Sequence, residues 1–253
     1  MRIAVAGGTG MVGAMLVSRL ESRGDDVEVL ARSAGVDVVS DTRLAARLDG
    51  VEAIVDTLSV GTTRAKVATP FFERTSQRLL EAGREVGVRH HVVLSIVGID
   101  RMAGFGYYRG KLAQESVVRR SGSAYTILRA TQFHEFAGQL LERGRVGPLA
   151  VVPRMLVAPV AADEVAAALA ELATAEPRNA TLELAGPAEE RVHLMARRLV
   201  RHLGSRTPVL GVPLPGPAGR AMRTGALLSA DPWRVGSQRF EDWLAEQPGD
   251  GRR

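Results

Sequence analysis

The chain has 253 residues, of which 45% are apolar and 24% charged, so it is long enough to bury the core of one α/β domain with a smaller appended lobe. It contains no cysteine, which excludes disulfides and thiolate metal sites, and no apolar run has the length of a membrane span or a signal peptide. The net charge of +5 comes from scattered arginines and only 4% of the residues are aromatic, so we expect a soluble cytoplasmic protein without a nucleic-acid or membrane partner.

Short apolar runs alternate with longer amphipathic stretches through the first 145 residues. The runs that predict buried strands are 2–6, 27–31, 36–40, 53–58, 91–97 and 125–129, and the stretches that predict helices are 11–23, 41–48, 71–86 and 107–120. This alternation predicts an α/β fold of the Rossmann type, a doubly wound and mainly parallel sheet with helices on both faces.

After about residue 145 the pattern changes, because prolines cluster and separate short apolar pieces. The elements predicted there are a helix over 163–173, a strand over 181–185 and two short helices within 208–243. We therefore predict a dinucleotide-binding domain over 1–145 and a smaller substrate-side lobe over 146–253, intertwined with the first domain. The sequence leaves open whether the protein is a homo-oligomer.

A glycine-rich loop follows the first predicted strand and opens the first predicted helix. In this loop Gly7 permits a tight turn, Gly10 lets the backbone approach a pyrophosphate, and Gly13 permits close packing of helix and strand. The unpaired amides and the positive dipole at the start of the helix then favour a bound diphosphate. The residues predicted to contact the cofactor here are Gly7, Thr9, Gly10, Met11, Val12 and Gly13.

The end of the second predicted strand distinguishes NADP from NAD. An NAD site carries Asp or Glu at this place to hold the ribose hydroxyls, whereas this chain has Ala31, Arg32 and Ser33. The Arg32 guanidinium would bind a 2′-phosphate and Ser33 would add a hydroxyl, while the alternative for Arg32 is an ordinary surface arginine. The sequence therefore favours NADP (NADPH) over NAD.

Four segments together carry a resemblance to a known family. They are GGTGMVG at 7–13, VVLSIVGID at 92–100, YYRGKLAQE at 107–115 and TILRATQFHEF at 126–136. The pieces APVAADEVA at 158–166, LAGP at 184–187 and FEDWL at 240–244 extend the likeness over nearly the whole chain. In combination they resemble the atypical short-chain dehydrogenase/reductase superfamily, and within it the NmrA-like, NAD(P)H-binding branch. The resemblance implies a Rossmann fold with a small carboxy-terminal substrate lobe.

The resemblance also implies a catalytic set. Reductases of this superfamily use a Tyr-x-x-x-Lys pair with a serine from an earlier strand, and Tyr107, Lys111 and Ser95 match that pattern. Residues i and i+4 share a helix face, so the Lys111 ammonium would lower the pKa of the phenol and hold the nicotinamide ribose. Tyr107 would protonate a carbonyl oxygen that Ser95 orients. This set predicts an NADPH-dependent oxidoreductase that reduces a small ketone, quinone or related organic substrate.

Further positions follow the ends of the later strands. Thr57, Leu58 and Ser59 are expected beside the adenosine, and Phe133 is expected to pack on the nicotinamide ring. His134 either meets the substrate or is a packed histidine. No set of His, Asp and Glu has the spacing of a metal site, so no metal is expected.

Two other functions fit the same sequence. One is a redox-sensing regulator that binds NADP without turnover, and the other is an enzyme of this fold that performs a non-redox isomerisation or cyclisation. The apolar residues of the second half form either a substrate pocket wall or the core of the lobe; they are Met155, Leu156, Met222, Leu227 and Leu228.

Overall fold

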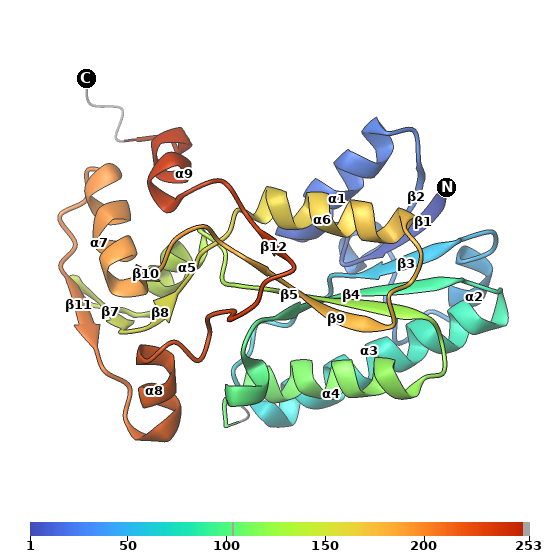
Figure 1. The fold of residues 1–253 in the computed structure, drawn as a ribbon, viewed down its shortest axis with the longest axis horizontal. Helices are drawn as coiled ribbons and strands as arrows, with labels where there is room; N and C mark the ends of the chain where they lie inside the picture. The colour runs from blue at the N-terminus through green and yellow to red at the C-terminus, as the bar shows by residue number, and fades with distance from the viewer. Residues whose placement is uncertain (103, 250–253) are drawn as a thin grey trace. The chain divides into compact units, whose positions relative to one another are not determined.

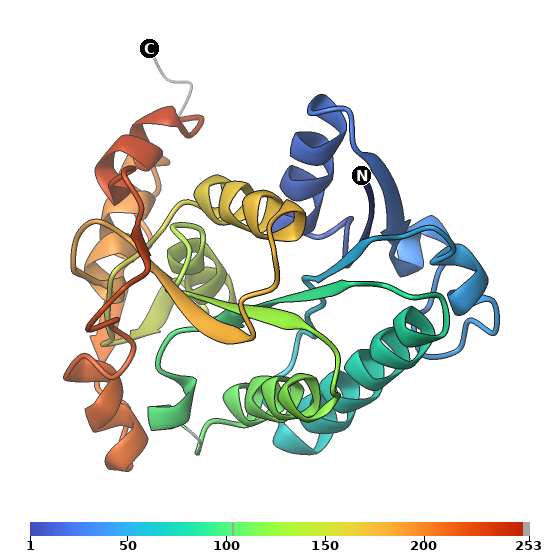
Figure 2. The same cartoon turned by 45° about the vertical axis from the view of Figure 1, so that its right-hand side comes forward.

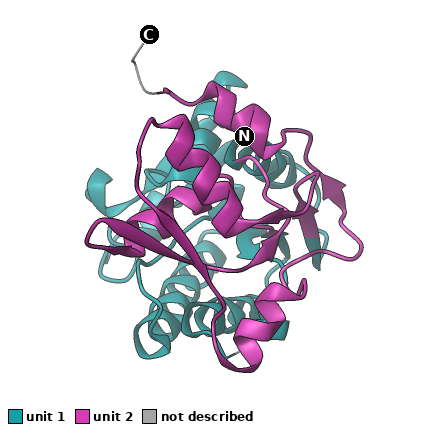
Figure 3. Cartoon of the chain, turned by 90° about the vertical axis from the view of Figure 1, so that its left-hand side faces the viewer, with its two compact units in different colours: residues 1–129, 162–182 teal, residues 130–161, 183–253 magenta. Residues whose placement is uncertain are grey.

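The computed structural model describes residues 1–102 and 104–249, and by its contacts the chain forms two compact units. The first contains residues 1–129 and 162–182, and the second contains residues 130–161 and 183–253 (Figure 3). Division at residue 145 was predicted from the sequence. By contacts, residues 130–145 group instead with the second unit, and the helix after residue 161 returns to the first.

The first unit alternates strands and helices as the sequence predicts. Its elements are β1 (Arg2–Ala6), α1 (Met11–Ser22), β2 (Asp26–Leu30), η1 (Arg32–Ala34), α2 (Leu44–Arg47), β3 (Ala53–Asp56), α3 (Ala65–Glu85), β4 (His90–Ile96), η2 (Ile99–Met102), α4 (Gly106–Arg120), β5 (Tyr125–Ala130), α6 (Ala162–Thr174) and the start of β9 (Ala180–Ala185). No helix within 1–102 and 104–249 is both long enough and apolar enough to cross a membrane.

The strands form a sheet in the order β12-β9-β5-β4-β3-β1-β2, where β12 is Arg234–Val235. Strand β1 pairs in parallel with β2 and β3, and β3 pairs in parallel with β4. Every residue of β3 is buried, as expected for a central parallel strand that is covered on both faces. The predicted mainly parallel, doubly wound sheet is confirmed.

Helices cover both faces of this sheet. Helices α1 and α6 pack together on one face and α3 and α4 on the other, as Figures 1 and 2 show. Alanines at the buried positions of α6 let this helix approach β3 and β4 closely. The carboxyl ends of β1, β2 and β3 therefore meet at one edge of the sheet, where open α/β sheets bind their ligands.

The predicted third strand, 36–40, is wrong. Val36 and Val38 are buried in the core beside Leu44, but the segment makes turns rather than a strand. The Asp37 carboxylate accepts hydrogen bonds from the amides of Val39 (2.9 Å) and Ser40 (3.4 Å) and so closes the turn. The sequence therefore predicted correctly that both valines are buried. The aspartate between them, however, closes a turn, so the segment is not a strand.

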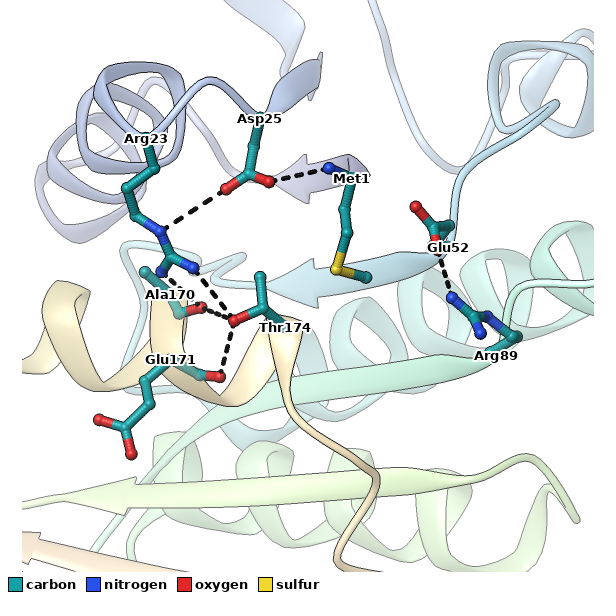
Figure 4. A network of polar contacts seen from close by, with 8 residues as sticks. All are labelled: Met1, Arg23, Asp25, Glu52, Arg89, Ala170, Glu171 and Thr174. Carbon is teal, nitrogen blue, oxygen red and sulfur yellow. Dashed lines mark hydrogen bonds and ion pairs between the residues drawn. The ribbon is translucent and has the colours of Figure 1, made fainter.

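Near the amino-terminal ends of β1 and β2, a set of polar contacts joins the segments that flank these strands (Figure 4). The amino group of Met1 lies 3.0 Å from the carboxylate of Asp25, and Arg23 lies 3.8 Å from the same carboxylate. Arg23 also donates to the carbonyl of Ala170 at 3.3 Å and to the hydroxyl of Thr174 at 3.2 Å. These contacts join the end of α1 to α6 at the edge opposite the glycine loop.

The second unit is built from short strands and helices. Its elements are α5 (Phe136–Arg143), β6 (Arg145–Val146), β7 (Leu149–Pro153), β8 (Leu156–Val157), the rest of β9, β10 (Glu190–Arg191), α7 (Val192–His202), β11 (Val209–Val212), α8 (Gly216–Arg223), β12 and α9 (Phe240–Glu246). Strand β7 pairs in parallel with β11 and antiparallel with β6. After β9, Gly186 passes so close to Pro159 that a Cβ atom would lie 1.8 Å from the Pro159 carbonyl oxygen.

The apolar residues singled out in the second half are mostly core. Met155, Met222 and Leu227 are buried, while Leu156 and Leu228 are half-buried. His134 is also fully buried, with its ring against Phe240 and Trp243 and its Nε2 atom 3.2 Å from the carbonyl oxygen of Gln238. Of the two alternatives for His134, a substrate contact or a packed histidine, the second therefore describes its place in this unit.

Two adjacent buried histidines lead to a stability prediction. Burial lowers the pKa of His90 from 6.5 to about 4, aided by the neighbouring His91, whose own pKa burial also lowers. The folded state keeps both rings neutral, whereas the unfolded chain takes up a proton on each below pH 6.5. The free energy of unfolding should thus fall as the pH drops from 6.5 towards 4, with His90 contributing at most about 3 kcal/mol.

Urea unfolding at about pH 7 and about pH 5 measures this effect. His90→Gln retains an amide that can hydrogen bond to Thr126, the present partner of the ring at 2.9 Å, but does not titrate. This variant should lose less stability on acidification than the wild type. An equal loss in both proteins would contradict the assignment.

Candidate cofactor and active site

The glycine loop between β1 and α1 has a geometry that only glycine allows. Gly7 has φ of +82° and its amide donates to the carbonyl of Leu30 at 2.9 Å, so the chain turns sharply at the end of β1. A Cβ atom on Gly13 would lie 2.1 Å from the Gly7 carbonyl oxygen. The first turn of α1 therefore packs directly against the loop backbone.

The start of α1 is free to bind an anion. Gly10 is the N-cap residue, no side chain caps the helix, and no acidic residue stands in the first turn. The amides of Met11, Val12 and Gly13 have no acceptor inside the helix, because the first turn lacks preceding carbonyl groups. Thr9, Gly10 and Met11 are exposed. Uncapped amides, the helix dipole and close backbone approach suit the diphosphate of a dinucleotide.

Arg32 and Ser33 stand at the end of β2, beside this loop. Both are exposed in η1, and the Ser33 hydroxyl lies 2.7 Å from the hydroxyl of Thr9. Arg32 makes no ion pair among the residues that the structure describes. The acids of β2 lie at its other end or are already paired, since Arg2 lies 3.3 Å from Asp26. A free guanidinium next to the glycine loop is therefore available to a cofactor phosphate.

The turn after β3 passes beside the glycine loop. The Thr57 amide and hydroxyl both donate to the carbonyl of Ala6, each at 2.8 Å, and Thr57 packs against Gly7. The Leu58 amide donates to the buried Asp56 carboxylate at 3.0 Å. These bonds hold Ser59 at the exposed tip of the turn.

The Ser59 hydroxyl lies 2.8 Å from the Tyr107 hydroxyl, at the start of α4. The half-buried Tyr107 ring packs edge-on against Phe72, with centroids 5.5 Å apart. The adjacent Tyr108 is buried, with its ring against Phe105. Of the two neighbouring tyrosines, Tyr107 is thus the one whose hydroxyl reaches the turn after β3.

Lys111 lies one helical turn after Tyr107 and is buried. Its ammonium donates to the Leu94 carbonyl at 2.6 Å and to Oε1 of Gln114, and lies 4.7 Å from the centroid of the Phe72 ring. Burial lowers the pKa of Lys111 to about 8, against the opposing effect of the Asp56 and Glu115 charges. The Lys111 ammonium therefore loses its proton at a pH closer to neutrality than the ammonium of an exposed lysine does.

Ser95 is not brought to Tyr107. Its buried hydroxyl donates to the Glu115 carboxylate at 2.6 Å, and Glu115 also pairs with Arg129 at 2.8 Å and Arg119 at 2.8 Å. Burial alone would raise the pKa of Glu115, but the hydrogen bonds from Arg129 and Ser95 and the two positive charges lower it. Tyr107 and Glu115 are eight residues apart, or about 12 Å along the helix axis. Ser95 therefore belongs to a buried ionic cluster.

Phe133, the last of the predicted cofactor contacts, lies later in the chain than the residues above. Phe133 follows β5 within the second unit, where its backbone forms a bridge with Val160. Its contact with a nicotinamide ring remains a prediction. Within the described residues, no group of three or more His, Asp or Glu side chains is arranged to hold a metal ion.

Sequence reasoning missed three features of this region. It did not predict the contact of Ser59 with Tyr107, the buried pair of Gln114 and Asp56, or the ionic cluster around Glu115. One signal was available, since Gln114 and Glu115 follow Lys111 by three and four residues and so share its helix face.

A separate groove of about 710 Å³ lies within the second unit. It runs between α7 and the segment before β11, and four arginines line it, Arg197, Arg198, Arg201 and Arg206. Arg198 is paired with Glu190 and Glu241. The lining contains none of the residues predicted to hold the cofactor.

A family model described as NAD(P)H-binding matches residues 7–176, which include the glycine loop, Tyr107 and Lys111. The chain belongs to this NAD(P)H-binding family. The predicted membership of an NAD(P)H-binding family is thereby confirmed, as is the binding of a nicotinamide dinucleotide. No curated protein sequence matches the chain.

Solved structures share the fold over nearly the whole chain. The NADPH-dependent quinone oxidoreductase QOR2 from Escherichia coli has a TM-score of 0.67 and 18% identity, over 96% of this chain and 98% of that protein. MoeE5 in complex with UDP-glucuronic acid and NAD has a TM-score of 0.72 and 17% identity, over 98% and 97%. A short-chain dehydrogenase/reductase superfamily protein from Agrobacterium tumefaciens with bound NAD has a TM-score of 0.69 and 18% identity, over 97% and 95%.

Proposed function

We propose that this protein is an NADPH-dependent reductase of a small ketone, quinone or related organic molecule. The observation that carries the proposal is the placement of Tyr107, Lys111 and Ser59. The phenol meets a hydroxyl from the turn after β3, and a lysine of lowered pKa follows on the same face of α4. The likeness in fold to a quinone oxidoreductase supports an activity of this class.

The roles of the chain's own groups follow from this placement. NADPH, when bound, would supply a hydride to the carbonyl carbon of a ketone substrate. Tyr107 donates its phenolic proton to the carbonyl oxygen, so that the C=O double bond is replaced by a C–H and an O–H bond. The Lys111 ammonium stabilises the phenolate that remains, and the Ser59 hydroxyl orients the phenol.

The preference for NADPH rests on Arg32, which is exposed and carries no ion pair among the described side chains. Arg32→Glu should weaken NADPH binding by roughly 10- to 100-fold, because a charge-assisted bond to the 2′-phosphate is lost and a like charge replaces it. NADH binding should change little. Titration of both cofactors by intrinsic fluorescence checks this, and an unaltered ratio of the two Kd values would mean that another group holds the phosphate.

A second function is favoured by one observation. Ser95, the hydroxyl that reductases of this superfamily place beside the tyrosine, is bonded to Glu115 instead. A protein that binds NADP and reports the redox state without turnover has no need of that hydroxyl. Oxidation of NADPH, followed by its absorbance with a panel of quinones and ketones, separates the two functions. Tight binding of NADPH with no substrate-dependent oxidation would favour the sensor.

A further inference from the structure

A chain of buried side chains runs from Lys111 to the turn after β3. Gln114 and Asp56 are both fully buried. The Oε1 atom of Gln114 accepts a hydrogen bond from Lys111, and its Nε2 atom donates to Oδ2 of Asp56 at 2.8 Å. Because an amide has distinct donor and acceptor ends, an ammonium on one side and a carboxylate on the other select a single orientation of Gln114.

Asp56 links this chain of side chains to the backbone of the turn after β3. Its Oδ1 atom accepts from the Leu58 amide at 3.0 Å, and its Oδ2 atom also accepts from the Ser76 hydroxyl at 3.3 Å. Leu58 directly precedes Ser59, whose hydroxyl meets Tyr107. The bonds from Lys111 through Gln114 and Asp56 thus reach the backbone of Leu58, and the contact of Ser59 with Tyr107 returns the connection to α4.

The geometry also limits where Lys111 can donate. An ammonium has three N–H donors, and the Leu94 carbonyl and Gln114 take two of them. One donor remains, and its direction is set by the other two bonds. A four-carbon side chain that otherwise has many rotamers is thereby held in one position.

We propose that Gln114 and Asp56 are positioning residues of the cofactor site, which orient the Lys111 ammonium and couple it to the turn that carries Ser59. The role as part of a reductase rests on the proposed function. The charge of Asp56 acts on Lys111 through Gln114, without direct contact. In agreement, Asp56 and Glu115 raise the pKa of Lys111 against the larger effect of burial.

The chain's composition allows a direct test, because its only two lysines are Lys66 and Lys111. Lys66 is exposed on α3 and acts as an internal reference. NMR of protein labelled with ¹³C at lysine Cε then gives two titration curves without any cofactor. We expect the Lys111 signal to titrate near pH 8. Coincident curves would overturn the proposal.

Two substitutions at position 114 separate positioning from packing. Gln114→Leu removes the acceptor of the ammonium and should lower the pKa of Lys111 by about one unit. Gln114→Glu retains an acceptor and adds a negative charge, so it should raise the pKa of Lys111. Asp56→Asn removes a negative charge that raises the pKa of Lys111, so it should lower that pKa. Changes of the same sign in Gln114→Leu and Gln114→Glu would show a merely structural role, as would no change.

Gln77→Leu is the matched control, because Gln77 is exposed on α3 and has no hydrogen bond among the described residues. It should leave both lysine curves unchanged. Addition of NADP⁺ to the wild type should shift the Lys111 signal and not that of Lys66, and Gln114→Leu should raise the Kd for NADP⁺ about tenfold. Lysine titrations that behave as expected without any binding of NADP⁺ would reject the proposed function but retain the coupling.

If Gln114→Leu does not fold, as judged by circular dichroism, the titrations of Gln114→Glu and Asp56→Asn decide the question. Their expected shifts have opposite signs. A pKa of Lys111 equal to that of the wild type in both variants would overturn the proposal.

Discussion

Replacing Tyr107 with phenylalanine is expected to lower kcat for carbonyl or quinone reduction by roughly 10²- to 10⁴-fold, the range typical of a lost general acid. The Kd for NADPH should stay within about twofold, because we propose that the glycine loop, Arg32 and Lys111, and not the phenol, hold the cofactor. The ring itself packs edge-on against Phe72 and remains in place. Single-turnover kinetics and cofactor titration measure the two quantities separately.

Tyr108→Phe is the matched control for this experiment. Tyr108 is adjacent, but it is buried with its ring against Phe105, and position 112 is a leucine, so it lacks a lysine partner one turn along. Its kcat should resemble that of the wild type. Ser59→Ala should lower kcat by about tenfold, since the phenol loses one hydrogen bond. Full activity of Tyr107→Phe would remove Tyr107 from the mechanism.

Gly13→Ala is expected to abolish cofactor binding, with a rise in Kd of at least about 100-fold. In a helix, glycine to alanine normally stabilises by about 1 kcal/mol. Here the new Cβ atom would lie 2.1 Å from the Gly7 carbonyl oxygen, 2.8 Å from its carbonyl carbon and 2.9 Å from the Cα atom of Gly8. The neighbours are backbone atoms, so the loop that we propose binds the diphosphate must move. Isothermal calorimetry with NADPH and NADH measures the loss.

Gly138→Ala in α5 controls for the effect of alanine on a helix. A Cβ atom there meets only the Leu199 side chain, at the ordinary contact distance of 3.5 Å. This variant should bind NADPH normally and unfold at a slightly higher temperature. Gly13→Ala protein that folds and binds NADPH like the wild type would show that the diphosphate lies elsewhere.

Several features of the candidate site could be predicted from local sequence. The glycine loop was recognised because backbone conformation and close packing restrict the residue type at Gly7 and Gly13. The spacing of Tyr107 and Lys111 identified a shared helix face, because the period of a helix does not depend on what it packs against. Strands β1, β3, β4 and β5 were recognised because central parallel strands are continuously apolar.

The partners of those residues were decided only by the tertiary structure. The resemblance assigned Ser95 to the catalytic set, but its hydroxyl donates to Glu115 in a buried ionic cluster with Arg129. Ser59, 48 residues before Tyr107, meets the phenol instead. Gln114 and Asp56 are 58 residues apart and lie on different elements. Periodicity and motif spacing report which face a residue occupies, whereas its hydrogen-bond partner depends on how a strand and two helices pack together. By itself, therefore, the sequence determined the fold class and the geometry of the glycine loop, and packing determined which hydroxyl stands beside Tyr107.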